Sequence, residues 1–286
     1  MKLRVSHFTH YAYSEPVSFS PHLIYLRPRE TPQQRLHTFS LNISPTAKVY
    51  PIRDAHDNTL SWAHFPEAAR ELMIHAAFEV ESLVSNPFDF ILETAAIRFP
   101  FTYRPADHFA LAPYLAPPFA ETRTALSRWL DEHFANRPTE TVPMITALNQ
   151  LIFATLRYQR REEHGIQPSA VTLQLGSGSC RDFAVLLAEF CRMLGIAARF
   201  VSGYLYAPPD DDQRSYGAMH AWTEVFLPGA GWRALDPTHG IFCHDAFIPV
   251  AHAAEAESVN PIQGRLYSPH PVSAQLETTV LVEPIN

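Results

Sequence analysis

The segment GSGSCRDFAVLLAEFCRMLGIAARFVSGYL, residues 176–205, has the pattern of a glycine-containing loop, an amphipathic helix and a strand in succession. The apolar side chains of the middle part share one helical face, at Phe183, Leu186, Leu187, Phe190 and Leu194. Gly195 follows at the position where a left-handed residue ends many helices. The β-branched and aromatic residues of 198–207 predict a strand. We therefore expect a helix that begins near Cys180 and is followed by a strand.

Cys180 stands where the loop turns into this helix. The first-turn N–H groups of a helix are unpaired and its dipole is positive there, which favours a thiolate and can hold an oxyanion. The alternative is a small buried side chain that happens to begin a helix. Cys191 lies ~16 Å further along the same axis, too far for a disulfide or shared metal ligation with Cys180. A reactive thiol at Cys180 is thus one of two interpretations.

A second segment, AMHAWTEVFLPGAGWRALDPTHG at residues 218–240, predicts a β-hairpin with a glycine-containing turn. If Leu227 pairs with Gly231, His220 and Asp236 share one face of the hairpin, ~7–8 Å apart between Cα atoms. A shift of one residue would put them on opposite faces. A thiolate nucleophile needs a base and a group that orients that base. Taken singly, His220 also fits a half-buried strand histidine and Asp236 a turn residue.

The remaining sequence divides into regions of different pattern. Residues 1–84 predict an antiparallel β-sandwich or small barrel, with strands at 3–13, 36–44, 59–65 and 75–84. Residues 85–118 are rich in proline and aromatic side chains and predict an ordered connector. Residues 119–286 form the expected C-terminal domain, with its core at about 140–245. Its first helices are expected at 121–135 and 141–158, the latter with Thr141 as N-cap, and its last strand at 278–283.

Composition and charge limit the cellular location and the partners that we expect. The chain has 286 residues with 29 acidic and 22 basic side chains, and this net charge of -7 gives no basic footprint for nucleic acid. No apolar run approaches the ~18 residues that span a bilayer, and the N-terminus lacks the apolar stretch of a signal peptide. Three cysteines are too few for a disulfide framework. We expect a cytoplasmic protein with a free thiol, no membrane partner and no nucleic acid partner, of unspecified oligomeric state.

The two segments, with their order Cys, His, Asp, resemble the core of the transglutaminase-like superfamily. Residues 1–34 and the turn DAHDN at 54–58 are similar to the N-terminal region of bacterial members described as cysteine proteases. The resemblance implies an α+β fold, with an N-terminal antiparallel β domain and a papain-like transglutaminase core. It also implies a catalytic triad of Cys180, His220 and Asp236. One departure is VAHAA at 250–254, where many such proteins carry Gly-Arg-Asp, so the role of that arginine is open here.

Further site residues are expected around the triad. Gln174 lies six residues before Cys180, the offset of the oxyanion-hole glutamine in papain-like proteases. Tyr204 and Trp222 are candidates for walls of the acyl site, with core packing as the alternative. Asp182 is expected to cap the first turn of the helix.

These observations predict thiol-dependent acyl transfer on a peptide or protein amide through a thioester, without a metal or another cofactor. Hydrolysis by a cysteine peptidase or amidase is favoured, and an amine acceptor would make the protein a transglutaminase. A non-catalytic alternative is a binding or scaffold protein whose N-terminal β domain presents the ligand surface. A third possibility is a metalloprotein that uses a cluster of downstream side chains, namely His239, Cys243, His244 and His252.

Overall fold

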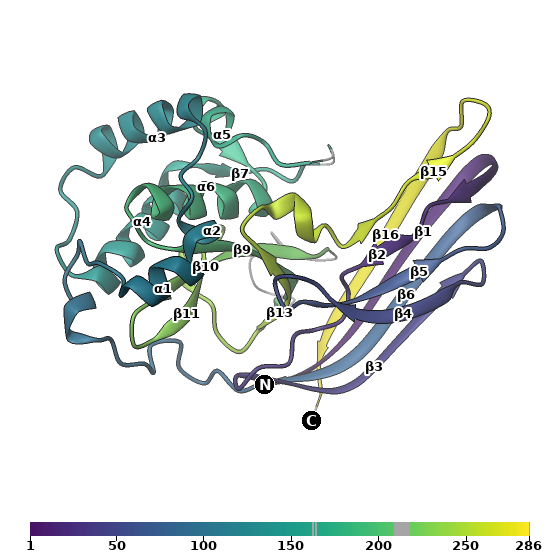
Figure 1. Cartoon of the computed structure of the whole chain (residues 1–286), viewed down its shortest axis with the longest axis horizontal. Coiled ribbons are helices and arrows are strands. Elements are labelled where there is room, and N and C mark those ends of the chain that lie inside the picture. Colours follow the sequence, from purple (N-terminus) through teal and green to yellow (C-terminus); the bar gives the residue numbers. More distant parts are fainter. Residues whose placement is uncertain (162, 164, 209–217, 286) are drawn as a thin grey trace.

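The N-terminal region forms two antiparallel sheets (Figure 1), and they share one apolar core. The computed structural model describes the whole chain except residues 162, 164, 209–217 and 286. The first sheet contains the long strands β1 (Lys2–Phe19), β6 (Ala69–Ser82) and β3 (Gln34–Ser44). The second contains β2 (His22–Ile24), β5 (Thr59–His64) and β4 (Lys48–Arg53). Buried positions alternate along β6, as expected for a strand with one face on the core. The expected antiparallel β region is therefore confirmed.

The C-terminal segment returns to these sheets. Strand β16 (Ala274–Pro284) pairs antiparallel with β1 over its whole length, while the short β14 (Ile262–Gln263) pairs with β2 and β15 (Leu266–Tyr267) with β1. The strand expected at 278–283 is present, but its partner belongs to the N-terminal sheet. Strands between residues 262 and 284, expected with the C-terminal domain, thus pair with the N-terminal sheets, where β16 covers the otherwise open edge of β1.

The connector at 85–118 contains short helical elements, η1 (Thr94–Ala96), α1 (Pro105–Ala110) and α2 (Ala112–Leu115). Tyr103 anchors this segment on the core. Its buried hydroxyl donates to the Phe226 carbonyl at 2.8 Å and accepts from the Ala197 amide at 2.9 Å. The Tyr103 hydroxyl therefore joins the connector to the backbone at residues 197 and 226 of the C-terminal half.

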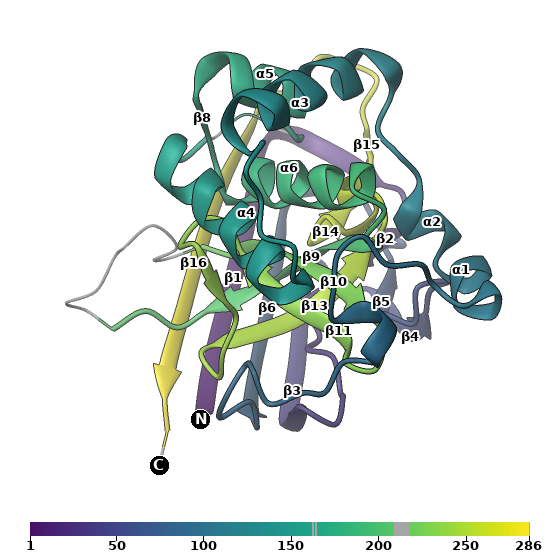
Figure 2. The ribbon, with the colours of Figure 1, turned by 90° about the vertical axis from the view of Figure 1, so that its left-hand side faces the viewer.

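Helices α3 (Ala120–His133), α4 (Thr141–Thr155), α5 (Ser169–Leu175) and α6 (Cys180–Met193) form the helical layer (Figure 2). The N-cap prediction for α4 is wrong by one residue. The amide of Thr141 donates to the Ile97 carbonyl, and Glu140 is still extended in a bridge with Arg98, so Glu140 is the N-cap. Gly195 has φ of 78° just beyond α6, as predicted from the sequence.

Helix α6 packs on a five-stranded antiparallel sheet. In spatial order its strands are β12 (Ile241–Phe242), β11 (Gly231–Asp236), β10 (His220–Leu227), β9 (Ala198–Leu205) and β13 (Phe247–Ala253). The Thr223 hydroxyl of β10 donates to the Ala184 carbonyl of α6 at 2.7 Å. Leu227 pairs with Gly231, which confirms the predicted hairpin register. The α+β architecture is thus as expected. Within the described residues no helix is long and apolar enough to cross a membrane.

Candidate active site

Cys180 is the first residue of α6, and the chain around it is fixed by one buried carboxylate. Asp182 accepts the Ser179 amide at 2.8 Å and the Ser179 hydroxyl at 2.7 Å, which confirms its expected capping role. The same carboxylate accepts hydrogen bonds from the Arg161 Nη1 at both of its oxygens and from the Gln167 amide. These contacts fix the helix start, so the position of the Cys180 thiol is fixed as well.

The loop before Cys180 is held from the other side. Strand β8 (Ser177–Gly178) pairs in parallel with β7 (Arg157–Tyr158), and the Gln159 amide donates to the Gly178 carbonyl at 2.8 Å. A Cβ atom on Gly178 would lie 3.1 Å from the Asp182 Cβ and 3.2 Å from the Phe183 ring. Glycine at 178 therefore lets the loop lie directly against the first turn of α6.

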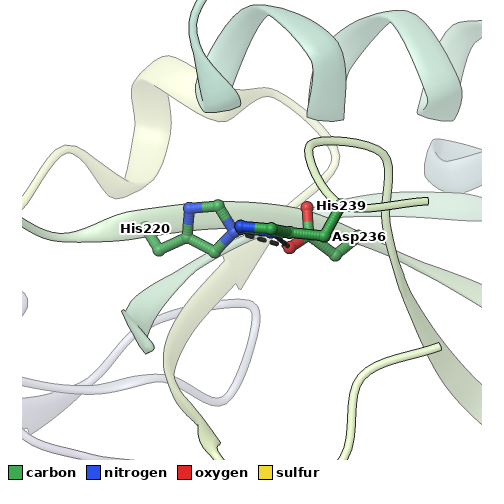
Figure 3. Close-up of side chains that lie close together, drawn as sticks. All are labelled: His220, Asp236 and His239. Atoms are coloured by element: carbon green, nitrogen blue, oxygen red, sulfur yellow. Dashed lines mark hydrogen bonds and ion pairs between the residues drawn. The ribbon is translucent and has the colours of Figure 1, made fainter. Parts of the chain in front are cut away.

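His220 and Asp236 meet as the hairpin register predicts. The His220 Nε2 lies 2.8 Å from the Asp236 Oδ2, and both side chains are fully buried (Figure 3). The His220 side chain also forms a hydrogen bond with Cys180. Because Nε2 is used by Asp236, Nδ1 is the ring nitrogen left for the sulfur. The structure thus brings Cys180, His220 and Asp236 into one chain of contacts.

Charge controls the protonation of this buried pair. Burial alone lowers the pKa of His220, but the Asp236 carboxylate and Cys180 outweigh it and raise that pKa to about 10. Burial raises the pKa of Asp236, whereas its contacts with His220 and His239 lower it below the usual aspartate range. The arrangement therefore favours an imidazolium beside an ionised carboxylate.

A fourth residue, His239, also contacts this carboxylate. Its Nδ1 lies 2.6 Å from the Asp236 Oδ2, and the Thr238 amide donates to Oδ1 at 2.8 Å. The sequence signal for this contact is the Asp-x-x-His spacing within DPTHG, whereas the sequence interpretation placed His239 in a metal set with Cys243, His244 and His252. In the part of the chain that the structure describes, His220, Asp236 and His239 are the set whose ligand atoms gather closely enough for a cation, all within 4.8 Å. Both nitrogens already hydrogen-bond to Oδ2, so a cation would have to replace both bonds.

A cleft of about 240 Å³ opens at the Cys180 thiol, which is partly exposed. The apolar side chains that line it are Ile166, Phe200, Met219 and Val259. Cationic side chains line it as well, namely Arg160, Arg161 and Arg181. His220 and Ser202 belong to the same lining. An acyl group can thus reach the sulfur from solvent.

The three supporting residues expected from the sequence do not line this cleft. Gln174 is exposed on α5, because the buried face of that helix is formed by Ser169 and Thr172. Tyr204 is fully buried, and its hydroxyl bonds to the His7 Nδ1 at 2.8 Å. Trp222 is also buried, behind His220, with its ring against Phe247. Both aromatic side chains are therefore packed in the core, the alternative expected for them from the sequence.

The residues of the metal alternative are likewise separated by their contacts. His244 pairs with Asp245 at 3.3 Å, and Cys243 packs in an apolar cluster with Trp222. His252 lies near Arg199 and Arg29, and burial together with these cations lowers its pKa to about 3. Burial raises the pKa of Cys191 to about 12 and that of Cys243 well above the ordinary value. These two thiols therefore stay protonated.

The VAHAA segment at 250–254, which differs from the family pattern, lies at the end of β13, where the core sheet contacts the N-terminal region. The amide and carbonyl of His252 bond to both ends of the Asn58 side-chain amide, at 2.9 and 2.8 Å. Asn58 belongs to the DAHDN turn and is itself held by Asp54. The segment thus docks the N-terminal turn through the backbone of His252.

Comparison with known proteins agrees with this description. Residues 3–81 match the bacterial transglutaminase-like N-terminal region, and residues 128–237 match the transglutaminase-like superfamily. An uncharacterized protein of Mycobacterium tuberculosis strain H37Rv is 30% identical over 284 residues, covering 93% of this chain and 88% of that protein. One from Mycobacterium leprae is 24% identical, covering 93% of each. A crystal structure from Cytophaga hutchinsonii, described as a candidate cysteine protease, has a TM-score of 0.75 at 16% identity and covers 100% of this chain and 92% of that one.

The fold is therefore that of a papain-like core joined to an antiparallel β region, the architecture expected of transglutaminase-like proteins. The chain belongs to the transglutaminase-like superfamily and carries the bacterial transglutaminase-like N-terminal region.

Proposed function

We propose that the protein is a cysteine hydrolase that cleaves peptide or protein amides through a Cys180 thioester. The observation that carries the proposal is the buried His220 ring, which is bonded to Asp236 through Nε2 and to Cys180 at the start of a helix. A base with an orienting carboxylate on one side and a thiol on the other is the arrangement that nucleophilic catalysis requires.

In this reaction the Cys180 sulfur attacks the amide carbonyl carbon and forms a tetrahedral oxyanion. The free N–H groups of the first turn of α6 stabilise the oxyanion. His220 gives its proton to the departing amine as the C–N bond breaks, which leaves the thioester. His220 then takes a proton from water, and the oxygen of that water attacks the thioester carbonyl carbon. The C–S bond breaks, the carboxylic acid is released, and the Cys180 sulfur is again paired with the His220 imidazolium.

We favour water over an amine as the acceptor for an electrostatic reason. A lysine or another primary amine is mostly a cation at neutral pH. Arg160 and Arg181 line the cleft, and their positive charges oppose the approach of such an amine, whereas the charge of Arg161 is balanced by Asp182. Water needs no charge complementarity and is always present. An amine acceptor, which would make the protein a transglutaminase, is the competing outcome. We also propose a cytoplasmic location.

The test is an activity profile of the purified protein against a panel of peptide amides, with and without a millimolar primary amine. We expect release of the free acid, unchanged by the amine and absent in Cys180→Ala. A dominant transamidated product would identify a transferase instead. No turnover of any amide by the wild type would contradict the proposal.

A further inference from the structure

The Asp236 carboxylate is held by more donors than a triad needs. Oδ2 lies 2.8 Å from the His220 Nε2 and 2.6 Å from the His239 Nδ1, and Oδ1 accepts the Thr238 amide at 2.8 Å (Figure 3). Since an ionised carboxylate can only accept, both ring nitrogens donate to the same oxygen. His239 therefore approaches Oδ2 at least as closely as the catalytic candidate His220 does.

The turn after β11 places His239 over the carboxylate three residues earlier. The Gly240 amide donates to the Asp236 carbonyl at 2.8 Å, and its φ of 69° closes the turn. Asn149 of α4 donates to the carbonyls of Asp236 and Ile241, at 3.3 and 3.2 Å. Both ends of the turn are thus tied to a helix, so His239 is held in place and is not part of a free loop.

We propose that His239 is a positioning residue: its Nδ1–H fixes the Asp236 carboxylate so that Oδ2 stays aligned with the His220 Nε2. The inference rests on the proposed function, because it assigns His239 to the same Cys180–His220–Asp236 system. Without His239, the hydrogen bonds that restrain the carboxylate torsion within the described residues are those from the Thr238 amide and from His220 itself. The group that must orient the imidazole would then be free to rotate away from it.

The surroundings of His239 make this testable. The side chains of His220 and Asp236 are fully buried, whereas that of His239 is 16% exposed and lines a hollow of about 200 Å³. Among the described residues, the Met1 amino group, Tyr206 and His244 lie around the hollow, Asp245 pairs with Met1 and with His244, and the Cys243 thiol lies near Asp236. A substitution at His239 therefore removes less buried contact than one at either partner.

The experiment compares His239→Phe and His239→Ala, which lack the donor, with His239→Asn, whose amide N–H can reach the position of Nδ1. The readout is the rate at which iodoacetamide labels Cys180, followed by peptide mass spectrometry over a pH series. We expect both donor-free variants to label roughly 10- to 100-fold more slowly near neutral pH, with a profile moved to higher pH. His239→Asn should stay close to the wild type.

Two results would overturn the inference: a wild-type labelling profile in His239→Phe, or equal impairment of His239→Phe and His239→Asn at equal melting temperature. Labelling needs no substrate, so it separates this inference from the proposed reaction. If no amide is cleaved by the wild type but the labelling shift is found, His239 positions the pair and the proposed reaction fails. If amides are cleaved and His239→Phe leaves kcat, KM and labelling unchanged, the reaction stands and the role of His239 fails.

Discussion

The His220 imidazole is enclosed between a carboxylate and a thiol, and each contact has a separate consequence for turnover. Cys180→Ala removes the nucleophile and His220→Ala the proton carrier, so either should reduce amide turnover by about 10³-fold or more. Asp236→Asn keeps the shape but loses the charge, and we expect a loss of about 10²- to 10⁴-fold. Initial rates check this, with circular dichroism as the folding control. Near-normal activity in Cys180→Ala would refute covalent catalysis at this residue.

The protonation of His220 also affects stability. Its pKa is raised to about 10, although burial alone would lower it, because Asp236 and Cys180 favour the charged ring. The unfolded chain releases this proton near pH ~6.5. The stabilisation is therefore complete below that pH and is lost as pH rises through about 10. Denaturant titrations should show a declining free energy of unfolding over this range, and His220→Asn should show a weaker decline. Identical slopes would contradict the assigned charge.

Strands β9 and β10 show how an element can determine a side-chain position. Gly203 of β9 lies directly opposite His220, and a Cβ there would overlap the Ile248 carbonyl and lie 2.5 Å from the Trp222 ring. Gly203→Ala should lower the unfolding free energy by about 1–3 kcal/mol and slow Cys180 labelling. Thermal melts check the first effect, with Asn42→Ala on the exposed side of β3 as a control outside the site. A wild-type melting temperature for Gly203→Ala would contradict this prediction, since it would show that neighbouring atoms move to accept the methyl group without loss of stability.

Elements and contacts that depend on neighbours in the sequence were predicted better than those that depend on tertiary packing. Periodicity and the glycine turn were sufficient for α6 and for the hairpin register, because both depend on neighbours in sequence. Gln174 was misplaced because its position depends on which face of the short α5 is buried. The contact of His239 with Asp236 was missed because it depends on the backbone of a single turn.

The two halves of the molecule meet across a continuous apolar cluster that includes Leu3, Val5 and Phe78 of the N-terminal sheet and Tyr204 and Ile248 of the core. The two halves could be predicted from sequence patterns. Their junction could not, because the pairing of β16 with β1 joins residues at opposite ends of the chain. The N-terminal region is therefore part of the support of the core sheet that carries His220.

Asn58 contacts the core across this junction through both polar atoms of its side-chain amide. Asn58→Ala leaves the buried amide and carbonyl of His252 unpaired, and we expect a loss of about 2–4 kcal/mol of unfolding free energy. Denaturant unfolding measures it, with Asn42→Ala on the exposed side of β3 as the matched control. Equal stabilities of the two variants would show that the junction does not depend on this turn.

The most direct measurement for the whole account is the reactivity of Cys180 in the wild type and in His220→Ala. At about pH 6.5 an ordinary thiol is only about one per cent ionised. Cys191 and Cys243 are buried and serve as internal references. Brief iodoacetamide labelling followed by peptide mass spectrometry should show Cys180 reacting far faster than both in the wild type. In His220→Ala, its labelling profile should move to higher pH. An unchanged Cys180 profile in His220→Ala would contradict the thiolate–imidazolium pair.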